Sequence, residues 1–411
     1  MIVLAIHSGS ELGGSTLNLG FIVKTLVSRS HTVFVLNREP SDEGSRYLER
    51  CGARLLYFPP FSLRMNTTTI LESVRCGFVK ELRTTLEDFV KLVTGLLLAL
   101  RYIKRIRPAI LLVTDSALPQ FVQVAKWLHI PVICELQAEL IRGRYGLRRK
   151  IYTYLLRRSD RVFGITRFHI EPFQTSPSRD GRVTVIPNTV DCEAVGEMPE
   201  FDIRTAYGIP KEKKVVSYFG GASQVKGCRF LLSVVRQVVA ARDDVVFVLA
   251  GPFHLDFSTE WGLGSIKNDR AETEYLFEFV NANALAGNVR IVGEVTNAVA
   301  IMRQSDVVVS SNSFPHFSRT IIEAFQSTVP VLASKDKFSR EVIEDGQSGM
   351  LAEFGRPAEW VGKLSHLLDD RRRAREMAEQ GRRVYESAFH PGMVSAQISQ
   401  LFESLYAELC R

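Results

Sequence analysis

The sequence predicts an α/β protein with two domains, each built on a doubly wound parallel sheet. Its 411 residues exceed what one hydrophobic core usually holds. Its composition, 45% hydrophobic and 24% charged, is that of an ordinary globular protein. Short runs rich in Val, Ile and Leu alternate with helix-length segments along most of the chain. Such runs are typical of strands buried on both faces, and their alternation with helices indicates parallel sheets with right-handed crossovers.

Thirteen candidate strands divide between the two halves of the chain. The first half contains seven, at residues 2–6, 32–36, 54–58, 110–115, 131–136, 161–166 and 183–188. The second half contains six, at residues 214–221, 245–251, 289–293, 307–311, 329–334 and 349–353. A polar stretch with two prolines separates the halves, at residues 188–214. We therefore expect an N-terminal domain, a C-terminal domain and a last helix that packs back on the first, at residues 1–192, 193–385 and 386–411.

Charge and targeting signals narrow the class of protein. The net charge of +7 is too small to indicate nucleic acid, but it favours phosphorylated substrates or an anionic surface. The six scattered cysteines are typical of reduced thiols in the cytosol. We expect no signal peptide in residues 1–10 and no spanning helix in segment 89–106, which is interrupted by Lys91 and Arg101 and is shorter than the roughly 20 apolar residues that a spanning helix needs. We expect that segment to be a buried or interfacial helix, and the protein to be cytoplasmic, at most peripheral on the inner face of the membrane.

Glycine turns follow the first strand of each half, where doubly wound sheets bind their ligands. Gly13 and Gly14 precede a helix that we expect to be amphipathic, and its first N–H groups could face an anion. Gly220 and Gly221 lead to Lys226, which could meet a diphosphate as a point charge. The residues alone leave two alternatives open: tight strand-to-helix turns and a solvated lysine.

A single acid stands on an otherwise apolar helical stretch in the segment "SRTIIEAFQSTVPVLAS", residues 318–334. The N–H groups of Ser318, Arg319 and Thr320 open this helix and are available to a phosphate. Glu323, within about a turn of them, could accept hydrogen bonds from sugar hydroxyls. It could equally cap a nearby N–H of its own helix.

Seven fragments, taken in order, resemble the retaining glycosyltransferases of the GT-B fold, family 4 (glycosyl transferases group 1). The resemblance covers nearly the whole chain and is strongest from residue 183 to residue 356. The fragments are "GGSTLNLGFIVKTLVSRSHTVFVL", "VTVIPNTVD", "YFGGASQVKG", "VVFVLAG", "VRIVGEV", "SRTIIEAFQSTVPVLAS" and "EVIEDGQSGMLAEFG". It implies two Rossmann-like domains around a cleft and a metal-independent hexosyltransferase. No cofactor is implied beyond the nucleoside-diphosphate sugar that serves as donor.

The resemblance also implies roles for individual residues. Lys226 would meet the donor diphosphate, and Glu323, the second glutamate of the family's Glu-x7-Glu motif, would hold the ribose; we take these two as the catalytic candidates. The other donor-binding candidates are Gly220, Gly221, the phosphate-binding backbone at Ser318, Arg319 and Thr320, the base-binding turn at Gly293 and Glu294, and Gly13 and Gly14 from the opposite domain.

Three positions depart from the family pattern. The first glutamate of the motif falls on Pro315, with His316 beside it as a substitute contact or a solvated side chain. The usual arginine falls on Gly221, and the usual N-domain His-Asp pair falls on Gln137 and Ala138, with Glu135 just before. Glu135 and Gln137 remain acceptor-side candidates. The departures keep two alternatives open: a catalytically degenerate GT-B binding protein and a GT-B nucleotide-sugar epimerase.

The segment 142–158 carries seven basic residues and no acid. Leu147, Ile151, Tyr154 and Leu155 form an apolar stripe at helical spacing, so the segment could lie on an anionic membrane or pack on the sheet with its charges in water. A membrane role would use Arg148, Arg149 and Lys150 and would favour a lipid-linked saccharide as acceptor. No group of His, Cys and carboxylate residues has the spacing of a metal site.

Overall fold

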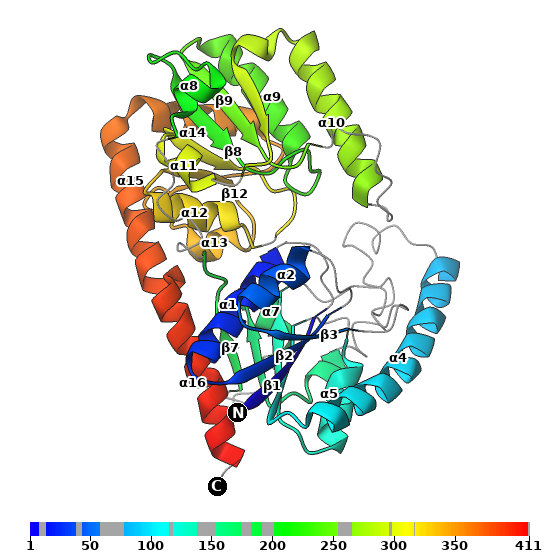
Figure 1. Cartoon of the computed structure of the whole chain (residues 1–411). Helices are drawn as coiled ribbons and strands as arrows, with labels where there is room; N and C mark the ends of the chain where they lie inside the picture. The colour runs from blue at the N-terminus through cyan, green and yellow to red at the C-terminus, as the bar shows by residue number, and fades with distance from the viewer. Residues whose placement is uncertain are drawn as a thin grey trace. The chain divides into compact units, whose positions relative to one another are not determined.

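The structure is a computed structural model that describes residues 1–7, 14–37, 43–57, 78–114, 118–137, 153–173, 182–190, 201–253, 265–295, 298–315 and 317–409. The chain forms two compact units (Figure 1). The first comprises Met1–Asn188 and Gly392–Arg411, and the second comprises Thr189–Pro391.

The first unit contains a seven-stranded sheet in the order β3-β2-β1-β4-β5-β6-β7, and every strand pair is parallel. The order reverses between β1 and β4, so the segments that follow these two strands diverge at the carboxyl edge of the sheet. The strands are β1 (Ile2–Ile6), β2 (Thr32–Asn37), β3 (Arg54–Tyr57), β4 (Ile110–Val113), β5 (Val132–Leu136), β6 (Arg161–Gly164) and β7 (Val183–Val185).

Two apolar clusters cover the two faces of this sheet, because successive strand side chains point to opposite sides. One cluster joins strand residues such as Val3 and Ala5 to α1 (Gly14–Ser28) and to the C-terminal helix α16 (Pro391–Leu409). The other joins Leu4 and Ile6 to α4 (Phe78–Ile106) and α5 (Gln120–Trp127). The remaining helices are α2 (Glu43–Arg50), α7 (Arg167–Ile170) and a 3-10 turn (Glu171–Phe173).

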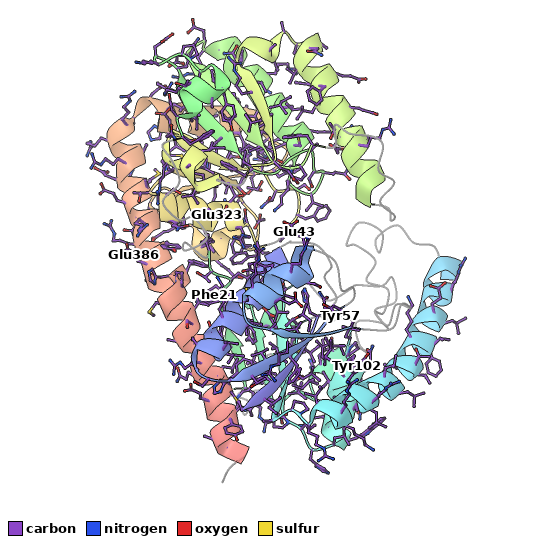
Figure 2. The ribbon with its side chains drawn as sticks, viewed as in Figure 1. Phe21, Glu43, Tyr57, Tyr102, Glu323 and Glu386 are labelled. Carbon is purple, nitrogen blue, oxygen red and sulfur yellow. The ribbon has the colours of Figure 1, made fainter. Side chains whose placement is uncertain are left out.

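The expectation of an amphipathic helix after the first glycine turn is wrong for α1. This helix is buried nearly all round, at Thr16, Asn18, Leu19, Gly20, Phe21, Ile22, Val23, Thr25 and Leu26. The physical reason is tertiary: α1 packs against α2, and its apolar side chains share one core with residues of α16, far away in the sequence. Phe21 is labelled on this helix in Figure 2.

The second unit contains a six-stranded sheet, also wholly parallel, in the order β10-β9-β8-β11-β12-β13. Here the order reverses between β8 and β11. The strands are β8 (Lys214–Tyr218), β9 (Val245–Ala250), β10 (Val289–Gly293), β11 (Val307–Ser310), β12 (Val331–Ser334) and β13 (Met350–Ala352).

The helices of the second unit enclose its sheet around a core that includes the fully buried Trp360. The Trp360 indole donates a hydrogen bond to the Glu353 carbonyl at 3.0 Å. The helices are α8 (Ile203–Tyr207), α9 (Cys228–Ala241), α10 (Ser265–Ala282), α11 (Ala298–Arg303), α12 (Arg319–Ser327), α13 (Ser339–Val342), α14 (Pro357–Asp369) and α15 (Arg371–Val384), with a 3-10 turn (Leu285–Gly287) and a π-helical turn (Tyr385–Phe389). Within the described ranges, every helix falls short of the length and apolar character that crossing a bilayer requires.

The predicted fold class is confirmed: both units are doubly wound parallel sheets, and each predicted strand overlaps one of β1 to β13. Several strands end earlier than the apolar runs predicted. Strand β8, for example, ends at Tyr218 rather than at residue 221, because the chain leaves the sheet at the Gly220–Gly221 turn.

Candidate functional site

Two loops of the second unit meet where its strand order reverses. The first, residues 219–227, follows β8, and the second, described at residues 311–315, 317 and 318, follows β11; we call their meeting point the switch-point site. Ser311 donates its hydroxyl to the Lys226 carbonyl at 3.1 Å. Ser313 donates its backbone N–H to the Val225 carbonyl at 2.9 Å and its hydroxyl to the Gln224 carbonyl at 2.8 Å. These bonds fix the two loops against each other at the place where doubly wound sheets bind ligands.

Glycine is required at two positions of the first loop. Gly221 has φ 59°, and a Cβ there would lie 2.5 Å from the Pro252 carbonyl oxygen. Gly227, which immediately precedes α9, has φ 73°, and a Cβ there would lie 1.9 Å from the Ser311 carbonyl oxygen. Neither backbone conformation nor space admits a side chain. The arginine that the family resemblance implies at position 221 would not fit this path of the loop.

Lys226 lies at the end of this loop, with its carbonyl held by Ser311. Burial lowers the pKa of its ammonium to about 8, and the carboxylates of Glu323 and Asp336 offset part of that effect. A cation held in a poorly solvated place with incomplete compensation gains from a nearby anion. This environment suits a side chain that receives a phosphate.

The start of α12 lies on the other side of the site. Ser318 precedes the helix and is buried, but its hydroxyl bonds to the Ser310 hydroxyl at 3.0 Å and makes no capping bond to the helix. The first-turn N–H groups that follow, at Arg319 and Thr320, are therefore not capped by Ser318. With the positive end of the helix dipole, they form a place suited to a phosphate oxygen.

Glu323 makes an ion pair that sequence reasoning missed. Its Oε1 lies 3.3 Å from Nη2 of Arg319, one turn earlier in α12, and its side chain is only 15% exposed. The pair explains how a largely buried glutamate is held on this helix. Figure 2 labels Glu323. The (i, i+4) spacing of the two residues was the signal that could have found it.

Two further polar residues of this edge were also missed. Asn312 follows β11 and is buried, and its Nδ2 has no hydrogen-bond acceptor among the described residues. Leaving such a donor unpaired costs about 1–3 kcal/mol, so a ligand or water oxygen that reached Nδ2 would gain that free energy. Asp336 follows β12, accepts a hydrogen bond from the Ser339 N–H at 2.9 Å, and has a pKa raised to about 6 by burial. The strand order β8-β11-β12 brings the loops that carry these two residues to the same edge of the sheet as Lys226.

The predicted base-binding turn lies at the same carboxyl edge of the sheet. Gly293 ends β10 with φ 75°, and its carbonyl accepts a hydrogen bond from the Gly251 N–H at 2.8 Å. Glu294, the next residue, is exposed.

The acceptor-side candidates of the first unit lie at the carboxyl end of its sheet. Glu135, in β5, is fully buried and accepts a hydrogen bond from the Asn18 amide of α1 at 2.5 Å. Burial raises the pKa of Glu135 to about 8, although the amides of Gln137 and Asn18 act in the opposite direction. This carboxyl group is therefore mostly protonated at neutral pH.

A histidine that sequence reasoning missed lies where the first sheet reverses. His7 directly follows β1, is buried, and is hydrogen-bonded to Thr114 at 3.0 Å and to Thr16 at 3.2 Å. Gly14, predicted to approach the donor, is the first residue of α1. The first unit thus also gathers polar side chains at its own point of reversal.

Several predicted site residues lie outside the described residues, namely Gly13, His316, Arg148, Arg149 and Lys150. Of the apolar stripe predicted beside the basic run, Leu147 and Ile151 also lie outside them. Tyr154 is 62% exposed, and Leu155 is half-buried.

Two units, each built on a doubly wound parallel sheet, are the architecture of the GT-B fold. Comparison with known structures agrees on the fold. A glycosyltransferase from Rickettsia africae superposes with a TM-score of 0.75 and 16% identity, covering 100% of this chain and 98% of its own. Anabaena Alr3699/HepE, solved in complex with UDP, gives a TM-score of 0.75 and 17% identity, covering 98% of this chain and 100% of its own.

Sequence comparison identifies the family. The model for "Glycosyl transferases group 1" matches residues 200–384, and the model for a "Glycosyl transferase 4-like domain" matches residues 13–189. The chain belongs to the group 1 glycosyltransferases of the GT-B fold, as the seven sequence fragments predicted.

Several curated relatives carry transferase names. A phosphatidyl-myo-inositol mannosyltransferase of Mycolicibacterium smegmatis is 29% identical over 54% of this chain and 51% of its own length. The lipopolysaccharide core biosynthesis mannosyltransferase LpsB of Rhizobium meliloti is 25% identical over 59% of this chain and 69% of its own length. For the first of these, the match spans about half of the relative's length.

Proposed function

We propose that the protein is a retaining hexosyltransferase that moves a sugar from a nucleoside diphosphate to a glycan acceptor. The observation that carries the proposal is the convergence of Lys226 and the start of α12 on the switch-point site. A donor diphosphate needs a cation and oriented N–H groups, and this site offers both. The two structural neighbours are GT-B proteins, and one of them binds UDP, which supports a nucleotide ligand.

Each of these residues would contact a particular part of the donor. Lys226 and the first N–H groups of α12 would bind the two phosphates, and the turn at Gly293 and Glu294 would hold the base. Glu323 would bind the ribose hydroxyls, exchanging part of its ion pair with Arg319 for those hydrogen bonds.

As the bond to the sugar breaks, negative charge grows on the departing diphosphate. Groups already aimed at that charge stabilise the transition state without reorganising. Lys226 and the helix start supply such groups from the protein itself, so we propose that the reaction needs no metal ion and no cofactor.

We further propose a lipid-linked saccharide as acceptor and a role in cell-surface polysaccharide or glycolipid synthesis at the cytoplasmic face of the membrane. The names of the two mannosyltransferases, one acting on an inositol lipid and one on the lipopolysaccharide core, support this choice. Glu135 and Gln137 are the proposed acceptor-side residues, and the basic residues Arg148, Arg149 and Lys150 would contact anionic lipid.

Two alternative functions compete with transfer. Pro315, Gly221 and Gln137 stand where the family carries residues for the donor sugar and for catalysis, and this favours a binding protein without turnover. A GT-B nucleotide-sugar epimerase is the other alternative.

One experiment separates the three. Purified protein is incubated with a panel of nucleoside-diphosphate sugars, with and without EDTA, and followed by proton NMR. Slow release of nucleoside diphosphate and a free sugar of retained anomeric configuration, unchanged by EDTA, is the result that the proposal expects. Binding without turnover would favour the degenerate protein, and an epimeric nucleotide sugar would favour the epimerase.

A further inference from the structure

Helix α4 of the first unit carries a continuous apolar face that no described residue covers. Its members are spaced three or four residues apart, so they follow one side of the helix over about three turns. They are 61%, 64%, 62%, 46% and 68% exposed, in the order Leu86, Phe89, Val90, Val93 and Leu97. We call these five residues the α4 stripe. Isolated exposed apolar residues are ordinary, but a contiguous set of this kind marks an interaction surface.

The opposite side of α4 is anchored, so the stripe cannot turn inward. Ala99 and Ile103 are fully buried in the core beneath the helix. A Cβ at Gly95 would lie 2.7 Å from the Gln120 side chain, which shows how closely α4 approaches α5. The Tyr102 hydroxyl donates a hydrogen bond to the Tyr57 carbonyl of β3 at 2.6 Å, and Figure 2 labels both residues.

The charges on α4 change along its length. Near its start, Arg83 is paired with Glu87 at 3.0 Å. From residue 89 to residue 107 the chain contains no acid and five basic residues. Arg101 and Lys104 stand four and seven residues after Leu97, so they continue the line of the stripe. Both are exposed, and no ion pair with them is found within the described part of the chain.

A neighbouring helix presents an exposed aromatic residue on the same face of the sheet. Trp127 ends α5, which packs against α4, and is 58% exposed. Tryptophan is favoured at the boundary between lipid and water, because its ring is apolar and its N–H is polar.

We infer that α4 docks the protein on an anionic lipid bilayer, with the α4 stripe among the lipid chains and with Arg101 and Lys104 on the headgroups. An apolar stripe that runs into unpaired cations is the pattern of helices that lie in the membrane interface. The net charge of +7 favours the same partner and disfavours a second copy of the chain. A stable protein interface also uses about 20–30 residues a side, whereas the stripe has five.

This inference deepens the proposed function, on which it rests for the idea of a membrane-borne acceptor. Binding of α4 to lipid can nevertheless be measured without any donor or acceptor. It also assigns the docking surface to a helix other than the basic run at residues 142–158, so the two surfaces can be separated by substitution.

The test is flotation of the full chain with vesicles of neutral phosphatidylcholine, or of phosphatidylcholine with phosphatidylglycerol, at several salt concentrations. The double variant Phe89→Ser/Leu97→Ser should weaken partition onto anionic vesicles about a hundredfold, because two largely exposed apolar side chains lose their burial. Its matched control is Met393→Ser/Tyr406→Ser on α16, where the two side chains are 47% and 39% exposed. That control should partition as the wild type does.

A second pair of variants tests the charges. Arg101→Gln/Lys104→Gln should weaken binding to anionic vesicles about thirtyfold at low salt, from two lost cations near the surface. Its control is Arg372→Gln/Arg375→Gln, two exposed arginines of α15 in the second unit. That control should change nothing, and the wild type should bind neutral vesicles weakly.

Three results would overturn the inference. They are absence of the wild type from anionic vesicles, equal partition of the Phe89/Leu97 variant and its control, and a wild-type dimer in sedimentation that this variant dissolves. Calorimetry with nucleoside diphosphates on the same proteins keeps the two claims apart. If no protein binds a nucleotide while the vesicle results hold, the proposed function fails and the docking surface stands.

Discussion

Replacing Lys226 by methionine should stabilise the free protein and weaken its binding to nucleoside diphosphate. Methionine keeps most of the chain length of lysine and removes the charge. Burial moves the pKa of the ammonium from 10.5 to about 8, and a shift of that size corresponds to roughly 3 kcal/mol. That free energy opposes folding at neutral pH, so Lys226→Met should raise the free energy of unfolding by up to about 3 kcal/mol. In the liganded site, the same substitution removes a charged hydrogen bond worth about 1.5–3 kcal/mol, which is roughly a ten- to hundredfold loss of affinity.

The effect on stability has a defined pH dependence. The folded wild type loses the proton of Lys226 near pH 8, whereas the unfolded chain keeps it until about pH 10.5. Between these values the unfolded state binds more protons, so the stability of the wild type rises with pH and the advantage of Lys226→Met shrinks. Affinity for the nucleotide behaves in the opposite way: it should fall above pH 8 in the wild type and stay level in the variant.

Urea unfolding and calorimetry at pH 7 and pH 9.5 measure both effects. Lys335→Met, at a more exposed lysine beside Glu353, is the matched control and should leave affinity unchanged. An unchanged dissociation constant in Lys226→Met would remove this residue from the site. A variant less stable than the wild type at pH 7 would refute the account of its burial.

Three other substitutions test separate parts of the account. Glu323→Gln should weaken nucleoside diphosphate and intact donor alike by about tenfold in calorimetry; a change only in which sugar is accepted would make Glu323 a sugar ligand. Gly221→Arg, which restores the family's residue, should destabilise the protein by about 1–3 kcal/mol or more in urea unfolding, because of φ 59° and the contact with Pro252; equal stability would contradict the tight turn. The free energy of unfolding of the wild type should fall as the pH rises from about 4.5 to about 8, since the folded protein holds the Glu135 proton to about pH 8, and Glu135→Gln should remove this fall. Parallel stability profiles for wild type and Glu135→Gln would show that Glu135 is ionised at neutral pH.

The fold was predictable from the sequence because its strands are buried on both faces. Such strands are continuous apolar runs, as in residues 245–250, and they can be recognised in the sequence without knowledge of the strands beside them. The burial of α1 could not be recognised in the same way, because its apolar side chains share one core with residues of α16 at the other end of the chain. Segment 89–106 stayed open between a buried and an interfacial helix, and the structure shows one anchored side and one exposed side.

The site likewise contains residues that the sequence could identify and residues that only the fold could identify. Lys226 and the start of α12 could be singled out because each follows a recognisable strand end. The ion pair of Glu323 with Arg319 was within reach of spacing arguments, but neither Asn312 nor Asp336 belongs to a local pattern. Their importance arises from the order of β8, β11 and β12 in the sheet, which places three distant loops at one edge.

A structure of the protein with a nucleoside diphosphate bound tests the central claim most directly. We predict that the phosphate oxygens lie within hydrogen-bonding distance of the Lys226 ammonium and of the first N–H groups of α12. Glu323 should have turned from Arg319 to the ribose hydroxyls. A nucleotide bound away from the switch-point site, or a diphosphate there without contact to Lys226 and α12, would contradict the assignment.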